Sequence, residues 1–173
     1  MKDIVMIGYA GLSDSLSLLM ESRDELKARF SEYFLDRAEK AFRGAMLSRE
    51  EAEELKRELL ESSLAESVIN AENGIYAALW DLGEELESGL SVNLKDIPVL
   101  QEGIELANYL DRNPYLADSE GVLVMATEEK KKIFDFFQKR GIPTKVIGSI
   151  IDRNKRVVVS GERETFLTPE RRR

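Results

Sequence analysis

Cysteine and histidine are both missing from this chain of 173 residues. Their absence excludes disulfide bonds, thiolate nucleophiles, imidazole general bases and the common zinc-ligand sets. Any chemistry would therefore rest on carboxylates, lysines, tyrosines or hydroxyl groups. No arrangement of these in the sequence forms a recognisable catalytic or metal-binding motif, so we expect no catalytic residue and no metal site.

Long apolar runs and an excess of basic residues are missing too. No segment approaches the roughly 18 apolar residues of a membrane span, and the N-terminus lacks the pattern of a cleaved leader. We therefore expect a soluble, cytoplasmic protein with no membrane partner. The 33 acidic residues outnumber the 25 basic ones, which gives a net charge of −8. Such a field repels polyanions, so we expect no nucleic-acid partner.

The size and composition of the chain indicate one ordinary domain. Its hydrophobic content of 43% is enough for a continuous core, and no proline- or glycine-rich linker interrupts it. We expect a single domain over residues 1–165. Residues 166–173 end in three arginines and are expected to form a basic tail.

Hydrophobic spacing predicts a series of helices and strands. Serine and glutamate three residues apart form a capping box that predicts a helix start at Ser22 and again at Ser48. Two β-branched runs near the C-terminus, joined by a short polar stretch, predict a hairpin. The expected elements are strand 3–8, helix 24–43, a helix from Ser48, helix 74–86, strand 90–94, a helix from Ile97-Pro98, strand 121–126, a helix capped by Thr127, and the hairpin strands TKVIGSIID and RVVVSGE. This order predicts an α+β domain with helices packed on a mostly antiparallel sheet.

Four segments in this order resemble one superfamily. They are DIVMIGYAGLSDSLSLL, ENGIYAALWDLGEE, VNLKDIPVLQEGIELANYLDRNPYLADSEGVLVMAT and KRGIPTKVIGSII. Together they resemble the C-terminal domain of aminoimidazole ribonucleotide (AIR) synthase-related proteins, nearest to the group of hydrogenase maturation factors and selenophosphate synthetase. The resemblance implies a three-layer α/β/α domain with partial ferredoxin-like topology. In that family an N-terminal half carries the ATP and magnesium carboxylates.

Departures from the family pattern matter for function. The chain begins at the strand that opens the C-terminal domain, so we expect the ATP-binding half to be absent. Relatives carry a His-Asp-Val-Thr-x-Gly-Gly motif before the helix at 74–86, and Val68 and Ile69 occupy its histidine and aspartate positions. The resemblance therefore implies ATP and magnesium only if a separate ATP-binding half is supplied.

Three polar segments are candidates for ligand binding. The amides after Asn73 and Gly74 could hold a phosphate at a helix N-terminus, or Asn73 could be a helix cap only. A loop carboxylate at Glu120 could point into a cleft, with Asp118 beside it. The candidate ligand-binding residues are Gly11, Ser13, Asn73, Gly74, Ser119, Glu120 and Gly121.

Two functions remain open from the sequence. The first is a stand-alone, degenerate domain that is not an enzyme by itself. It would bind a protein partner or form a homodimer through the face that the N-terminal half covers in the family. The alternative is a phosphate or nucleotide binder, or one half of a split ATP-dependent synthase or hydrogenase maturation-type enzyme.

Overall fold

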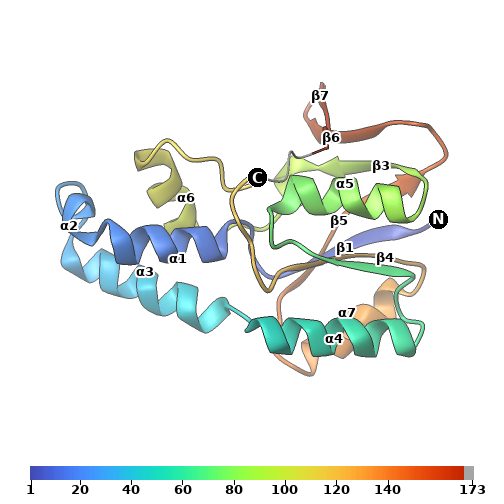
Figure 1. Ribbon diagram of the computed structural model, residues 1–173, viewed down its shortest axis with the longest axis horizontal. Helices are drawn as coiled ribbons and strands as arrows, with labels where there is room; N and C mark the ends of the chain where they lie inside the picture. The colour runs from blue at the N-terminus through green and yellow to red at the C-terminus, as the bar shows by residue number, and fades with distance from the viewer. Residues whose placement is uncertain (170–173) are drawn as a thin grey trace.

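Seven strands form one mixed sheet in the computed structural model, which describes residues 1–169 (Figure 1). The strand order is β2-β4-β1-β5-β3-β6-β7. The strands are β1 (Asp3–Ile7), β2 (Ser67–Asn70), β3 (Gly89–Asn93), β4 (Leu123–Thr127), β5 (Thr144–Ile151), β6 (Arg156–Ser160) and β7 (Arg163–Phe166). All neighbouring pairs are antiparallel except β3 and β6, which run parallel. The predicted α+β class with a mostly antiparallel sheet is confirmed.

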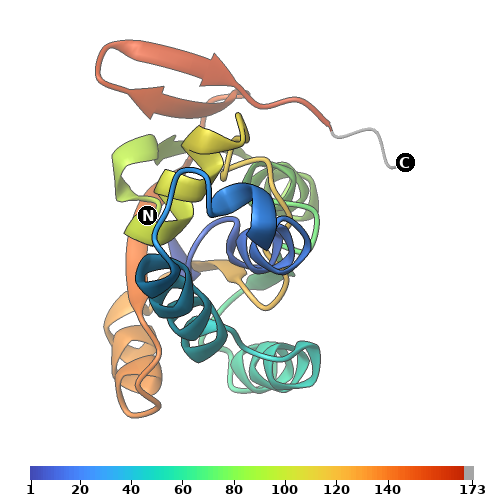
Figure 2. The same ribbon diagram turned by 90° about the vertical axis from the view of Figure 1, so that its left-hand side faces the viewer.

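Helices cover both faces of this sheet. Side chains alternate along β1, so Ile4 and Met6 enter the apolar cluster that includes α5, whereas Val5 and Ile7 enter the cluster that includes α4 and α7. The covering helices are α4 (Arg49–Glu61), α5 (Ile75–Glu85) and α7 (Lys130–Gln138). Because β1 is buried on both faces, the predicted three-layer arrangement is confirmed. Figure 2 shows the β6–β7 hairpin at the opposite end of the molecule from α4 and α7.

A helical lobe extends from one end of the sheet (Figure 1). It consists of α1 (Leu12–Glu21), α2 (Arg23–Leu26), α3 (Glu32–Ala45) and α6 (Gln101–Tyr109), with a short 3₁₀ turn η1 (Leu94–Asp96) before α6. The lobe has its own apolar cluster, in which Leu19, Leu35 and Phe42 are fully buried. The apolar residues whose spacing predicts the helix at 24–43 therefore pack in this cluster and not against the sheet.

Helices start at both predicted capping boxes, but only the one at Ser48 forms its side-chain cap. The helix expected over 24–43 is broken after Leu26, because Ser31 begins α3 and its Oγ accepts a hydrogen bond from the amide of Phe34 at 3.1 Å. Ser22 is the N-cap residue of α2, as predicted, but its side chain makes no cap hydrogen bond. Ser48 does form the predicted capping box, in which its Oγ accepts from the amide of Glu51 at 3.0 Å.

The helix expected to begin at Ile97-Pro98 begins instead at Gln101. Ile97 is buried, and the carbonyl of Pro98 accepts a hydrogen bond from the amide of Ala10 at 2.8 Å, so this stretch joins the turn after β1. The prediction that Thr127 caps the next helix was wrong, because α7 starts at Lys130 with Glu129 at its cap position. The Oγ of Thr127 accepts from the amide of Glu129 at 2.8 Å and donates to the carbonyl of Leu64, before β2, at 2.6 Å. Tertiary contacts therefore displaced both helix starts.

The predicted C-terminal hairpin was wrong as a pairing. The strands β5 and β6 exist, but β3 lies between them, so that Leu90 pairs with Ile150 on one side and with Arg156 on the other. The sequence between β5 and β6 looks like a tight turn, yet it crosses the start of β3. Gly89 makes this crossing possible, because a side chain there would overlap the carbonyl oxygen of Arg153. Strands β2 and β7 were not predicted.

The chain segment around Leu167 packs onto the sheet. The boundary expected between 165 and 166 falls inside β7, and Leu167 is buried with its amide donating to the carbonyl of Arg156 at 2.9 Å. Residues 170–173, which hold the expected basic tail's arginines, lie outside the described residues. Over the described part of the chain, every helix is too short or too polar to span a bilayer.

Candidate functional site

The seven candidate residues meet where three loops converge. These loops follow β1, precede α5 and precede β4. The amide of Gly11 donates to Ser119 Oγ at 2.7 Å, which joins the first loop to the third. The amide of Ser119 donates to the carbonyl of Ala71 at 3.2 Å, which joins the third loop to the second. Residues separated by up to 108 positions thus form one loop junction.

Ser119 is the centre of this loop junction and is fully buried. Its Oγ accepts from Gly11 and donates to the carbonyl of Ala117 at 3.1 Å, while its own carbonyl accepts from the amide of Val122 at 3.1 Å. Both the donor and the acceptor capacity of the hydroxyl are used within the protein. The geometry therefore gives Ser119 a role in holding the loops together.

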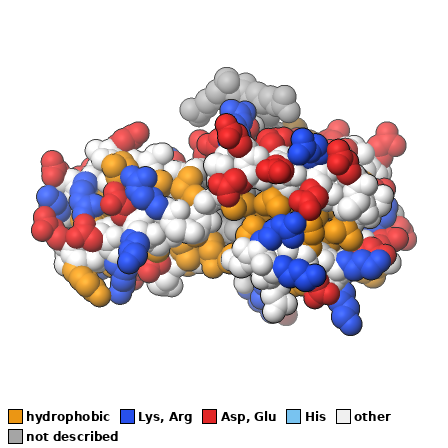
Figure 3. Space-filling view, turned by 90° about the horizontal axis from the view of Figure 1, so that it is seen from below, with side chains coloured by type: hydrophobic (Ala, Val, Ile, Leu, Met, Phe, Trp, Pro, Cys, Tyr) orange, Lys and Arg blue, Asp and Glu red, His pale blue; other side chains and the backbone are white. Residues whose placement is uncertain are grey.

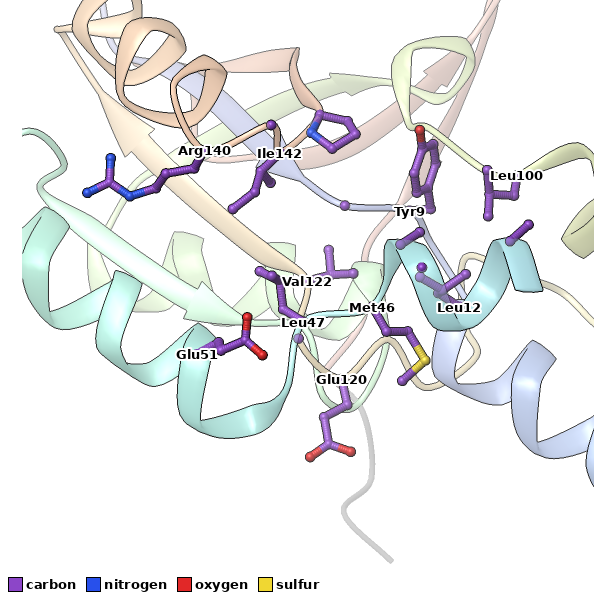
Figure 4. Close-up of a pocket in the computed structure, with 17 residues that line it drawn as sticks. Tyr9, Leu12, Met46, Leu47, Glu51, Leu100, Glu120, Val122, Arg140 and Ile142 are labelled. Atoms are coloured by element: carbon purple, nitrogen blue, oxygen red, sulfur yellow. The ribbon is translucent and has the colours of Figure 1, made fainter. Parts of the chain in front are cut away.

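Ser13 makes a second bridge across the loop junction. Its Oγ donates to the carbonyl of Asp118 at 2.8 Å and accepts from the amide of Glu120 at 3.0 Å. The carboxylate of Glu120 has no ion pair within residues 1–169, and Figure 4 shows it pointing away from the neighbouring pocket. Gly121 has φ +88°, and a Cβ there would lie 2.5 Å from the carbonyl oxygen of Leu47. Glycine thus allows the loop to touch the start of the α3–α4 connection.

The N-terminus of α5 also has partners inside the protein. Gly74 occupies the cap position with φ +105°, and Asn73 is exposed beside it. The amides of Ile75 and Tyr76 donate to the carbonyl of Tyr115 at 3.2 and 3.3 Å. These are two of the first-turn groups that an anion at a helix N-terminus would use. A backbone carbonyl already satisfies them.

The aromatic residue behind this helix start is held neutral. Tyr76 and Tyr115 stack with ring centroids 6.1 Å apart. Burial, reinforced by the neighbouring Tyr115, raises the pKa of the Tyr76 phenol above its usual value. The phenol is therefore protonated at neutral pH, where it packs against Tyr115 and is a poor general base. Within residues 1–169, no group of three or more Asp or Glu side chains is arranged to hold a metal ion.

A pocket of about 460 Å³ adjoins the loop junction (Figure 4). It lies between the turn after β1, the α3–α4 connection, the loop before β4 and the turn before β5. Glu120 and Gly121 line it, together with apolar side chains that include Leu47, Val122 and Ile142. Figure 4 shows Leu47, Val122 and Ile142 converging on the cavity. The pocket thus combines apolar side chains with polar groups, including Glu51 and Arg140.

Arg140 is the cation nearest this pocket, but its guanidinium has partners elsewhere. It binds the carboxylate of Glu58 at 3.1 Å and the carbonyl of Phe136 at 2.9 Å, and it lies 3.7 Å from the centre of the Phe136 ring. Sequence reasoning missed Leu47 and Ile142, because single apolar residues in connecting segments carry no periodic signal. Only the fold brings these segments together.

Replacing Ser119 with alanine is expected to lower the free energy of unfolding by about 1–3 kcal/mol, because the buried amide of Gly11 loses its acceptor. Urea unfolding followed by circular dichroism measures the change. Ser17→Ala, at an exposed position of α1, is the matched control and should stay within about 0.5 kcal/mol of the wild type. Equal stability of the two variants would contradict the bridging role of Ser119.

The arrangement of layers and strands defines an α+β domain of the AIR synthase-like fold. No protein-family model and no curated protein matches the chain. Several solved structures do match the chain. The "Crystal structure of E.coli HypE" superposes with a TM-score of 0.71 at 15% identity, over 99% of this chain and 51% of that chain. Thiamine-monophosphate kinase from Stenotrophomonas maltophilia K279a gives 0.66 at 15% identity, over 91% and 49%.

A third structure, T. maritima PurL complexed with ADP, gives a TM-score of 0.55 at 14% identity and covers 97% of this chain but 24% of that one. The chain therefore spans about half the length of the HypE and kinase structures, and less of PurL. At these identities the likeness concerns the fold. The resemblance predicted from the four sequence segments is confirmed at that level.

Proposed function

We propose that this chain is a non-catalytic interaction domain, which binds a protein through the face around the pocket and acts in the cytoplasm. The observation that carries the proposal is the loop junction. Its polar groups bind one another, as in the bridges made by Ser13 and Ser119, so few of them are directed at a ligand. The segments that predict a ligand site in the sequence therefore hold the three loops together through hydrogen bonds.

The chemistry of the pocket supports a protein partner over a phosphate. Apolar side chains such as Leu47, Val122 and Ile142 line much of it, the carboxylate of Glu51 lies at its margin, and the guanidinium of Arg140 is already paired with Glu58. An anion placed there would lose hydration and meet negative charge, whereas an apolar side chain would gain from burial. A protein that inserts such a side chain is the better match.

The comparisons supply a further supporting fact. A structure titled "Crystal structure of HypE-HypF complex" matches 96% of this chain and 52% of that chain, with a TM-score of 0.65. The fold therefore occurs in a protein that binds another protein. We propose that the partner here covers the face that the remaining half of the chain covers in such proteins.

A second candidate function is a phosphate or nucleotide binder, or one half of a split ATP-dependent enzyme that receives ATP and magnesium with a separate half. The convergence of all seven candidate residues at one loop junction favours it. Among the similar structures, one HypE is in complex with ATP and one PurL with ADP. The side chains still available for such a role are those of Asn73 and Glu120, with Ser13 partly exposed.

Thermal unfolding with ligands separates the two functions. We expect the melting temperature to stay unchanged with ATP and magnesium, with ADP and with inorganic phosphate. A ligand at about 100 times its dissociation constant would add about 2.7 kcal/mol, which such a scan detects. A saturable rise that Glu120→Ala or Asn73→Ala reduces would establish the second function in place of the first.

Capture experiments test the interaction itself. Tagged chain is used to recover proteins from extracts of its own cells, and Ile142→Glu is expected to lose what the wild type retains. Tyr33→Glu, at a position 76% exposed on the far lobe, is the matched control. Circular dichroism confirms that both variants are folded. Equal recovery with Ile142→Glu and the wild type would contradict the proposed face.

A further inference from the structure

One face of the sheet carries α4 and α7, and a groove lies there between α4 and the turn that follows α7. A cavity of about 410 Å³ follows this groove and is lined by four residues of α4 and by Leu47, Arg140 and Ile142. It shares Leu47, Glu51, Arg140 and Ile142 with the larger pocket, so the two form one continuous surface. Figure 3 shows apolar side chains along the middle of this face.

The α4 side of the groove is acidic. Glu51, Glu54 and Glu58 follow the spacing of one helix face, above the buried Leu55. Glu58 pairs with Arg140 at 3.1 Å. Glu51 and Glu54 have no ion-pair partner within the described residues. Negative charge on this side is therefore left uncompensated.

The α7 side of the groove is basic. Lys132 and Phe136 lie at i and i+4 in α7, and Lys139, the C-cap residue, follows at i+7. Arg140 lies in the turn just beyond the helix, and Asp135 is the acidic residue between the two lysines, so this side carries a net positive charge. Lys132 pairs with Glu129 at 3.5 Å, and Lys139 has no ion pair among residues 1–169. In Figure 3, acidic side chains gather on one side of the apolar strip, and lysine and arginine gather on the other.

This pattern is complementary to itself under a twofold rotation. A twofold axis that runs along the groove sets the acidic side of α4 against the basic side of α7 in a second copy, and does so twice, while Leu47 and Ile142 meet their counterparts. A uniformly basic partner would be repelled by α7, and a uniformly acidic one by α4. A second copy of this chain satisfies both sides at once.

We infer that the α4–α7 face is an isologous homodimer interface of this chain. The inference rests on the proposed function, because it names the partner as a second copy. Charge complementarity decides orientation and partner, and the apolar strip supplies the burial that stabilises the contact.

Light scattering of the purified protein across a concentration series tests the inference. We expect the wild type to dimerise. Glu54→Lys alone and Lys139→Glu alone are expected to be monomeric, because each places like charges together at both contacts. A 1:1 mixture of the two variants is expected to dimerise again, since both contacts then join opposite charges.

Matched controls carry the same charge change away from the groove. Glu53→Lys and Lys131→Glu lie on other faces of α4 and α7 and should dimerise like the wild type. Glu53→Lys and Glu54→Lys both change the net charge from −8 to −6, so a difference between them cannot come from net charge. Circular dichroism checks the fold of each variant.

Three results would overturn the inference. They are a wild type that is monomeric throughout, a dimer that tolerates both groove variants, and a mixture that stays monomeric. Capture of another protein that depends on Ile142 would leave the proposed function intact in the first case. Failure of both experiments would remove both proposals.

Discussion

Gly74→Ala is expected to lower the free energy of unfolding by about 2–6 kcal/mol. Gly74 has φ +105°, where a side chain costs about 1–3 kcal/mol in backbone strain. A Cβ there would also lie 2.7 Å from the carbonyl oxygen of Leu116, and such overpacking adds about 1–3 kcal/mol. Urea unfolding measures the loss. This loss of stability is expected because the loop that contains Leu116 packs closely against the start of α5.

Substitutions at two other glycines distinguish the cost of backbone strain from the cost of overlap with neighbouring atoms. Gly141 has φ +68° but no neighbour within 4 Å of a Cβ among the described residues, so Gly141→Ala should show the strain alone. Gly44 lies in α3 with the same open space and no positive φ, so Gly44→Ala should stabilise the protein by about 0.5–1 kcal/mol. If Gly74→Ala is no worse than Gly141→Ala, the loop does not close tightly over α5.

Phe137→Ala is expected to cost about 3–5 kcal/mol, the usual range for a large aromatic residue in a core. Phe137 is fully buried between α7 and the sheet, with its ring edge-to-face against Phe136 at 5.0 Å. Alanine there leaves a cavity that the surrounding strands fill only in part. Chemical unfolding measures the change in midpoint and slope.

Phe166→Ala is the control for this prediction, because Phe166 is 64% exposed at the edge of the sheet. It should change the stability by no more than about 0.5 kcal/mol. A similar small loss in Phe137→Ala would mean that α7 does not depend on this core contact. The position of α7 on the α4–α7 face would then not depend on the burial of Phe137.

Local chemistry made parts of the fold predictable from the sequence. The capping box at Ser48 and the apolar run of β1 depend on residues close together in the chain, and both are confirmed. The predicted hairpin failed because strand pairing is decided by distant residues. Nothing in the sequence around Arg156 indicates that Leu90 becomes its neighbour.

For the candidate site too, the residues could be predicted from local sequence, whereas their long-range contacts could not. The sequence singled out all seven residues, and the structure brings them to one loop junction. The partners of their polar groups could not be predicted, since Gly11 and Ser119 are 108 positions apart. The pocket was missed for the same reason. A ligand role for these residues is a proposal that the thermal-unfolding experiment addresses.

The position of β3 between β5 and β6 has a consequence for synthesis on the ribosome. Both neighbours of β3 are made after it, so β3 has no strand to pair with until the last quarter of the chain has emerged. One edge of β1 likewise has no partner strand until β5 has been made. Unpaired strand edges favour aggregation. We therefore expect the nascent chain to need chaperone protection until β5 and β6 have been made.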